Sequence, residues 1–220
     1  MTGPEREPET AAQAGIRPRW YDGPLYAWFY DPLERPHKAA IASLIPAGAS
    51  VLDLACGTGA LCLTLAPKVS RVLGVDASPR MLAQARRLAA KRGAENVSFT
   101  LAHAASLSLT ISEPFDYAVF SLFFHEVDDE TRLAALSQSA ALCSRIVLSD
   151  FSCPQPRNIV GAFNTAVERV VGGAGNYRLF RDFQGRGGVS GLARRLDLPV
   201  ERFFRDPAGA RDFLVVRGRK

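Results

Sequence analysis

A glycine-rich segment at residues 53–59, with the sequence Asp-Leu-Ala-Cys-Gly-Thr-Gly, carries the clearest chemical signal in the chain. It follows an apolar run at 50–54, and a second apolar run at 71–75 ends next to Asp76. Glycines permit a sharp turn and let a ligand approach the backbone closely. A carboxylate placed like that of Asp76 can accept hydrogen bonds from ribose hydroxyls at the carboxyl edge of an α/β sheet. The two segments therefore predict one edge that binds a ligand containing a ribose.

The glycine spacing argues against a dinucleotide, whose binding pattern is G-x-G-x-x-G. Counted from Gly57, the third glycine position holds Cys62; counted from Ala55, the first glycine is missing and the third position holds Ala60. In addition, the carboxylate of Asp53 would repel a pyrophosphate, whereas it suits a positive ammonium group. We therefore expect a ligand that has an ammonium group and a ribose but no phosphate.

Two stretches, VLDLACGTGALC at 51–62 and GVDASPRMLAQAR at 74–86, resemble motif I and the following motif of class I S-adenosylmethionine-dependent methyltransferases. The resemblance extends over roughly residues 20–217 and is strongest over 51–151. It is closest to the small bacterial methyltransferases that include enzymes of ubiquinone and menaquinone biosynthesis. The resemblance implies that the cofactor is S-adenosyl-L-methionine, which has an ammonium group, a sulfonium and a ribose but no phosphate.

The resemblance also implies cofactor contacts, residue by residue. Asp53 would lie near the methionyl end, and Asp76 would bind the ribose hydroxyls. The other expected cofactor-binding residues are Ala55, Cys56, Gly57, Gly59, Ala77, Ser78, Met81, His103, Ala104, Ser121 and Tyr21. After the third strand the family usually has an aspartate near the adenine amino group, and His103 stands there instead. A neutral imidazole can accept one hydrogen bond from that amine, so His103 is either an adenine contact or a plain loop histidine.

The acceptor side is expected at the end of the fourth strand, in the segment 115–127. There, His125 is the catalytic candidate, as a general base or as a group that orients the acceptor. The alternative is a histidine that is bonded within its own loop. Methyl transfer from a sulfonium is an in-line displacement on an activated donor, so positioning supplies much of the acceleration and no nucleophilic residue is required.

Two further segments are candidates for acceptor contacts. The aromatic segment 20–30 is expected either to cover the cofactor and acceptor as a lid or to pack on the sheet as a helix. The segment 176–183 resembles one that recurs in the relatives. The substrate-binding candidates are Tyr26, Tyr30, Tyr177 and Arg178. For Arg178 the alternatives are an acidic group of the substrate and a surface salt bridge.

Strands and helices alternate along the chain and must position these groups. The expected strands are 50–54, 71–75, 97–101, 115–121 and 145–149, and the expected helices are 33–44, 60–66, 78–92 and 128–142. Continuous apolar strands separated by helices predict a parallel sheet covered on both faces. The strands 200–205 and 212–217 are joined by a link too short for a parallel crossover, so they should be antiparallel. The predicted fold is α/β, a Rossmann-like doubly wound seven-stranded sheet, mostly parallel with a C-terminal antiparallel strand pair.

The length of 220 residues suits one domain. We expect a disordered tail at 1–18 and a single methyltransferase domain at 19–220. Its parts are an N-terminal helical lid at 19–48, a cofactor-binding core at 49–151, an acceptor-side insertion at 152–198 and a C-terminal strand pair at 199–217. Within the insertion, the Gly-rich region 160–192 is predicted to be irregular between helical pieces.

The bulk composition, 47% apolar and 22% charged, is that of a globular protein. No apolar run reaches the roughly 18 residues of a membrane span, and the N-terminus does not resemble a signal peptide, so a cytoplasmic protein is expected. The net charge of +5 comes from arginines spread along the chain, which indicates a solvated basic surface. The four cysteines lack zinc-type spacing, so we expect reduced thiols and no metal.

The expected function is methyl transfer from S-adenosylmethionine to a small-molecule acceptor by an enzyme that is a monomer or a homodimer. Two alternatives stay open. A basic pI of about 9.3 slightly favours an RNA methyltransferase. Against nucleic acid as a partner, the chain lacks the Asn/Asp-Pro-Pro-aromatic signature of amino-methylating enzymes and the Pro-Cys of cytosine-5 enzymes, although Cys153 is a conceivable nucleophile. The other alternative, a cofactor-binding scaffold without turnover, is favoured by His103.

Overall fold

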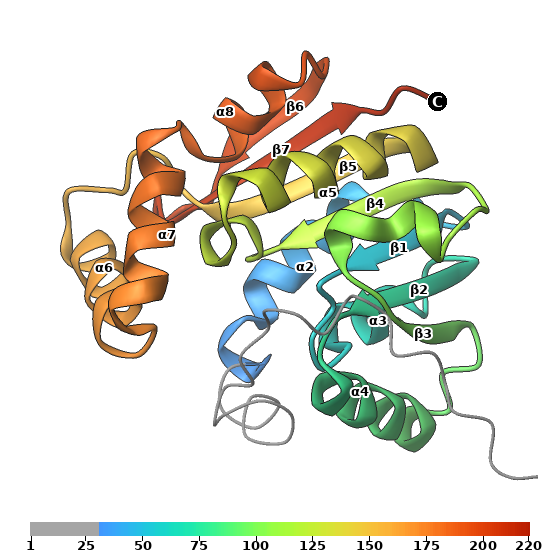
Figure 1. Cartoon of the computed structure of the whole chain (residues 1–220). Coiled ribbons are helices and arrows are strands. Elements are labelled where there is room, and N and C mark those ends of the chain that lie inside the picture. The colour runs from blue at the N-terminus through green and yellow to red at the C-terminus, as the bar shows by residue number, and fades with distance from the viewer. Residues whose placement is uncertain (1–30) are drawn as a thin grey trace, which may run out of the picture.

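One seven-stranded sheet organises the protein, in the strand order β3-β2-β1-β4-β5-β7-β6. The computed structural model describes residues 31–220 (Figure 1). The strands are β1 (Ser50–Leu54), β2 (Arg71–Asp76), β3 (Val97–Leu101), β4 (Phe115–Ser121), β5 (Cys143–Phe151), β6 (Val200–Arg205) and β7 (Arg211–Arg217). The helices are α2 (Arg35–Leu44), α3 (Ala60–Leu65), α4 (Pro79–Arg92), α5 (Asp129–Leu142), α6 (Ile159–Val170), α7 (Gly173–Gly185) and α8 (Gly188–Arg195). The predicted tail at 1–18 and the aromatic segment 20–30 lie outside the described residues.

The strand directions confirm the predicted fold. Strands β1 to β5 pair in parallel, whereas β7 is antiparallel to both β5 and β6. Because β7 runs backwards, it starts at the edge where the parallel strands end, and Arg211 pairs with Phe151, the last residue of β5. The C-terminal strand pair thus brings its own residues to the edge that carries the predicted cofactor loop.

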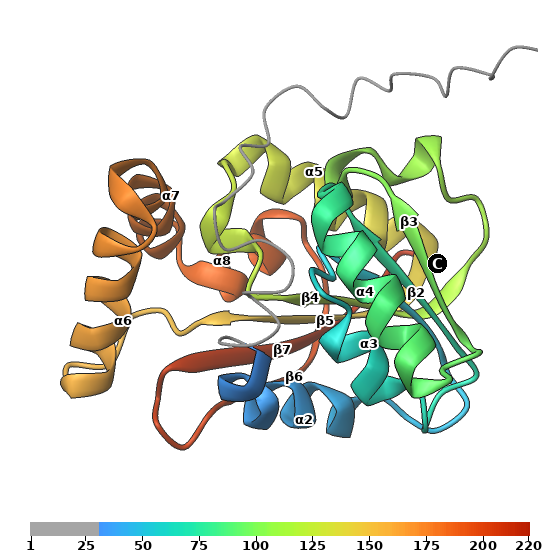
Figure 2. The ribbon, with the colours of Figure 1, turned by 90° about the horizontal axis from the view of Figure 1, so that it is seen from below.

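Helices cover both faces of the sheet, because alternate strand residues point to opposite sides and both sets are apolar. On one face, α2 and α3 cover strand residues that include Val51, Val119 and Val147. On the other face, α5 and α8 cover their neighbours in sequence, Leu52 and Leu148 among them. Figure 2 shows α2 and α5 on opposite sides of the sheet. This double cover makes the strands continuous apolar runs, as the sequence predicted.

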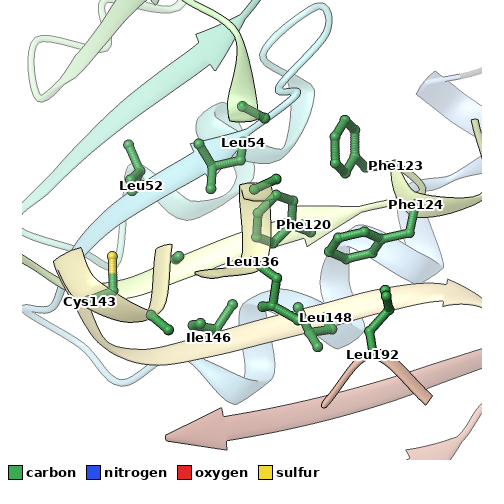
Figure 3. Packing of buried hydrophobic residues seen from close by; sticks show 14 of the residues in the cluster. Leu52, Leu54, Phe120, Phe123, Phe124, Leu136, Cys143, Ile146, Leu148 and Leu192 are labelled. Atoms are coloured by element: carbon green, nitrogen blue, oxygen red, sulfur yellow. The ribbon is translucent and has the colours of Figure 1, made fainter. Parts of the chain in front are cut away.

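An aromatic cluster fixes the chain where it leaves β4 (Figure 3). The ring of Phe120, at the end of the strand, lies 4.7 Å from that of Phe124 and 5.4 Å from that of Phe123. All three side chains are buried. Their packing holds the short helical turn Phe124–Glu126, which carries His125, against the end of the sheet.

Two local predictions differ from the structure in extent. In the region 160–192 the expected helical pieces are longer than predicted and form α6, α7 and most of α8, with little irregular chain between them. Gly172 and Gly173 lie where α7 begins, and Gly187 (φ 88) lies between α7 and α8. The strand predicted at 145–149 extends over Cys143–Phe151, because the antiparallel partner β7 continues the pairing as far as Phe151. Within the described part of the chain, no helix is both long and apolar enough to cross a membrane.

Candidate active site

The loop after β1 has the backbone shape that its glycines predict. Ala55 (φ 55), Gly57 (φ 55) and Gly59 (φ 73) all adopt the left-handed region. A Cβ added to Gly57 would meet nothing within 4 Å, so this glycine faces open space. A Cβ on Gly59 would lie 2.8 Å from the ring of Phe99. Gly57 therefore fits close approach by a ligand, whereas Gly59 is also needed for packing beneath the loop.

Both carboxylate oxygens of Asp76 accept hydrogen bonds from backbone amides. One oxygen accepts from the amide of Gly57 and the other from the amide of Ser78, each at 2.8 Å. The hydroxyl of Ser78 in turn accepts from the amide of Met81 (3.3 Å) and caps α4. Because a carboxylate has about four acceptor positions, an Asp76 oriented in this way fits the hydroxyls of a ribose. Ala77 lies between these two anchored residues.

Asp53 lies beneath the loop rather than on its surface, with 1% of its area exposed. Its carboxylate accepts from the thiol of Cys62 at 3.0 Å. Burial raises the pKa of Asp53 to about 7, against the effects of the Cys62 hydrogen bond and of the nearby Lys38 cation. The contact of Asp53 with the methionyl end of the cofactor stays a prediction.

The sequence interpretation missed a link between the loop and the segment that leads into α2. The Thr58 hydroxyl donates to Asp31. The ammonium of Lys38, a residue with 6% of its area exposed, lies 2.9 Å from the Asp31 carboxylate and 2.8 Å from that of Glu34. These bonds fasten the start of α2 to the cofactor loop.

His103 makes a local contact in the loop that follows β3. It caps the short helical segment Ala104–Leu109, and its Nδ1 accepts from the amide of Ala105 at 3.2 Å. A neutral ring with this bond has its proton on Nε2, which can donate to a ring nitrogen of adenine. The contact of His103 with adenine stays a prediction.

The catalytic candidate His125 is paired with an acid that the sequence interpretation did not identify. Its Nδ1 lies 2.7 Å from Oδ1 of Asp150, which is on β5 and has no exposed area. Asp150 also accepts from the amides of Phe124, His125 and Phe151. The histidine is thus not merely bonded within its own loop, because its main partner comes from the neighbouring strand.

Electrostatics keep this pair ionised. Burial alone lowers the pKa of His125, but the charge and hydrogen bond of Asp150, helped by Glu126 and Glu168, raise it to about 9. Burial raises the pKa of Asp150, but His125 and the backbone donors lower it to a value below its ordinary one. The other ring nitrogen, Nε2, lies 3.8 Å from a carboxylate oxygen of Glu126. It lies at the same distance from a carboxylate oxygen of Glu168, which is on α6. At neutral pH His125 is therefore a cation, and its role toward an acceptor stays a prediction.

A buried arginine supports the turn that carries His125. Arg132 of α5 has no exposed area, and its Nε donates to the carbonyl of Phe124 at 2.7 Å. Its other nitrogens donate to the carbonyl of Leu179 and to the carboxylate of Asp182, both on α7. Arg132 thereby joins α5, α7 and the turn after β4. In the sequence it was indistinguishable from a surface arginine of the predicted helix.

Ser121, at the end of β4, is bonded to a histidine of α2. Nε2 of His37 lies 3.2 Å from its hydroxyl, while Nδ1 of His37 has no partner among the described residues. Burial, together with the charge of Arg211, lowers the pKa of His37 to about 3. His37 is therefore neutral and holds the Ser121 hydroxyl at the cofactor edge.

Two of the predicted acceptor contacts, Tyr177 and Arg178, are on α7 and not at the ends of the strands. Tyr177 borders an open groove of about 800 Å³ between α7 and α6. Arg178 is exposed, and no ion pair to it is present in the described part of the chain, so its contact with an acidic group of the substrate stays a prediction. Tyr21, Tyr26 and Tyr30 lie outside the described residues.

The cysteines are free thiols. Burial raises the pKa of Cys153, and its thiol donates to the carbonyl of Gln184 at 3.2 Å, which disfavours a nucleophilic role. Within residues 31–220, no group of three or more His, Cys, Asp or Glu side chains is arranged to hold a metal ion.

Comparison with known proteins identifies the family. Residues 51–145 match the model of a methyltransferase domain. A demethylmenaquinone methyltransferase of Thermus thermophilus is 35% identical over 153 residues, which are 66% of this chain and 68% of that protein. A 23S rRNA (uracil(1939)-C(5))-methyltransferase of Shewanella amazonensis is 47% identical over only 55 residues, 25% of this chain and 12% of that protein.

Solved structures agree on the fold. The magnesium protoporphyrin IX methyltransferase of Synechocystis superposes with a TM-score of 0.62 at 20% identity, over 86% of this chain and 84% of that one. Three observations support the same family assignment: the strand order, the hydrogen bond from Gly57 to Asp76, and the extended match to the Thermus enzyme. The chain belongs to the class I S-adenosylmethionine-dependent methyltransferases.

Proposed function

We propose that the enzyme transfers a methyl group from S-adenosylmethionine to a small-molecule acceptor bound at the ends of β4 and β5 and the start of β7. The observation that carries this proposal is the buried pair of His125 and Asp150 beside the cofactor edge. A buried ion pair loses the free energy of hydration, and this loss is offset only when hydrogen bonds satisfy the remaining polar atoms of the pair. Here, Nε2 of His125 lies 3.8 Å from the carboxylates of Glu126 and Glu168, too far for a hydrogen bond to either, so its N–H can donate to an acceptor.

The extent of the sequence matches favours a small molecule over RNA. The match to the demethylmenaquinone methyltransferase spans 153 residues, more than the methyltransferase domain at 51–145 contains, so it extends beyond that domain. The match to the rRNA enzyme spans 55 residues, a quarter of this chain. Compounds with an acidic ring hydroxyl, such as quinols and phenols, are therefore the first acceptors to test.

The residues of the donor edge fit S-adenosylmethionine, which when bound supplies an electrophilic methyl group on its sulfonium. Asp76 binds the ribose hydroxyls, and the open face at Gly57 admits the cofactor against the loop. Ala77, Ser78, Met81, His103 and Ala104 surround the adenine, and Ala55, Cys56, Gly59 and Asp53 shape the loop toward the methionyl end. Ser121, held by His37, lies between this edge and the acceptor.

His125 acts on the acceptor as a cation. Its Nδ1–H is directed to Asp150, and its Nε2–H donates to the acceptor oxygen and stabilises the anionic form of that group. The acceptor proton leaves to solvent, and the acceptor attacks the methyl carbon as the bond from that carbon to sulfur breaks. Since the pKa of His125 is about 9, it orients and activates the acceptor rather than removing a proton at neutral pH.

The test is transfer of a labelled methyl group from S-adenosylmethionine to matched acceptor pools: quinols, phenols, phenol carboxylates, tRNA and rRNA. We expect label in a small-molecule pool and a loss of about ten- to hundredfold in kcat for His125→Gln, since a hydrogen bond to a charged group contributes about 1.5–3 kcal/mol. Arg217→Gln, a change at the far end of β7, serves as the control. Label found only in RNA, or full activity of His125→Gln, would contradict the proposal.

A further inference from the structure

We infer that Arg211 forms an anion-binding subsite for the acceptor, so that the substrate carries an anionic oxygen group, best matched by a carboxylate, close to the atom that is methylated. The inference rests on the proposed function, because it concerns the molecule that lies beside His125. Arg211 was not among the residues singled out from the sequence.

The direction of β7 brings Arg211 to the site. It is the first residue of an antiparallel strand and pairs with Phe151 at the edge where the parallel strands end. Its guanidinium lies 4.0 Å from the centre of the Phe151 ring. The same ring contacts the imidazole of His125, with 4.7 Å between the ring centres. Arg211 and His125 therefore flank one aromatic side chain.

The guanidinium of Arg211 has no ion-pair partner within 4.0 Å in residues 31–220, and its hydrogen bond goes to the carbonyl of Ala210 at 3.3 Å. Other arginines near the end of the chain are paired: Arg205 with Asp212 at 2.6 Å, and Arg217 with Glu201 at 3.0 Å. Arg211 is also partly buried, whereas Arg217 is exposed. A cation withdrawn from water without a partner is unfavourable, so an anionic partner from outside the described residues is expected.

The acids around Arg211 are engaged elsewhere. Those close enough to act on it by charge are Asp150, Glu34, Asp206 and Glu168. Asp150 bonds to His125 and to backbone amides. Glu34 bonds to Lys38 at 2.8 Å. Asp206 accepts from the amide of Ala210 at 2.6 Å, and Glu168 lies 3.8 Å from Nε2 of His125. Each acid thus lies against another group, and Arg211 keeps the planar, parallel donors with which a guanidinium binds a carboxylate.

Three ring compounds that differ in the charge of one substituent test this inference: salicylate, salicylamide and 2-hydroxybenzylamine. Each is titrated by calorimetry into the full chain saturated with S-adenosylhomocysteine. We expect salicylate to bind about ten- to hundredfold more tightly than salicylamide, the ratio for a hydrogen bond to a charged group. Arg211→Gln should remove this preference, Arg211→Lys should keep part of it, and Arg217→Gln should leave it unchanged.

The inference is overturned if Arg211→Gln retains the preference, if the amine binds most tightly, or if the native protein does not distinguish the three compounds. Affinity for S-adenosylhomocysteine and the midpoint of thermal unfolding, measured on each variant, show whether the donor edge and the fold are intact. A native protein that methylates a small molecule but does not distinguish the three compounds refutes the subsite alone. Label transfer only to RNA refutes the proposed function instead.

Discussion

Replacing Asp150 with asparagine is expected to lower the pKa of His125 from about 9 toward its ordinary value of 6.5. Burial by itself disfavours the charged imidazole, and the asparagine lacks the charge that contributes most against burial, which leaves only the smaller effects of Glu126 and Glu168. The side chains are nearly isosteric, so the packing around the turn after β4 should persist. The buried position of His125, with 4% of its area exposed, keeps solvent screening small.

The size of the effect follows from the shift. One pKa unit corresponds to about 1.4 kcal/mol, so the rise from 6.5 to about 9 in the native protein is about 3 kcal/mol of stability. Because the pKa is higher in the folded state, this stabilisation is complete below pH 6.5 and is lost as the pH rises through about 9. The lowered pKa of Asp150 comes from the same interaction with His125, so its stabilisation is not added to this value.

The assay is urea unfolding at a series of pH values from about 6 to about 10, with His125→Gln as the reference that lacks the titrating group. The stability difference between the native protein and this reference should shrink by about 3 kcal/mol across the series, and Asp150→Asn should not show that loss. NMR titration of the His125 ring gives the midpoint directly. A native midpoint at or below 6.5, or the same midpoint in Asp150→Asn, would refute the reasoning.

Three other changes test the donor edge and its support. Asp76→Ala should weaken S-adenosylmethionine binding by at least about tenfold in calorimetry, while Asp197→Asn, an exposed control, should not; equal affinities would exclude the ribose contact. Gly59→Ala should lower the free energy of unfolding by about 2–4 kcal/mol, because it adds a Cβ at a positive φ against the ring of Phe99. Phe99→Ala should recover part of that loss in the double variant, and strictly additive losses would contradict the clash. Arg132→Met should lower stability by about 2–4 kcal/mol without changing cofactor affinity, since it leaves buried carbonyls without donors.

The donor edge could be predicted from sequence because its parts are local. Gly57 and Asp76 each follow directly on an apolar run, and the two runs are neighbouring parallel strands. Chain order and strand alternation were therefore enough to place them together. The individual hydrogen bonds at this edge were harder to predict from sequence. The cap that His103 forms, for example, depends on the orientation of its ring.

The acceptor side could be predicted only in part. His125 was chosen as a candidate because it follows a predicted strand. Asp150 lies within an apolar run, and the sequence of that run predicts only a strand. Its role depends on β5 lying beside β4, which no local pattern specifies. Arg211 was missed for the same reason, because the sequence predicted that β6 and β7 pair but not that β7 also pairs with β5.

The reversed direction of β7 has a consequence for how such enzymes diversify. The loop after β1 and Asp76 lie close together in the sequence, whereas Arg211, which we propose as part of the acceptor site, begins β7 near the C-terminus. Under this proposal, substitutions in the turn between β6 and β7 would leave the segment that holds the cofactor unchanged. The C-terminal hairpin would then be a part of the fold in which acceptor preference can be altered separately from the donor edge.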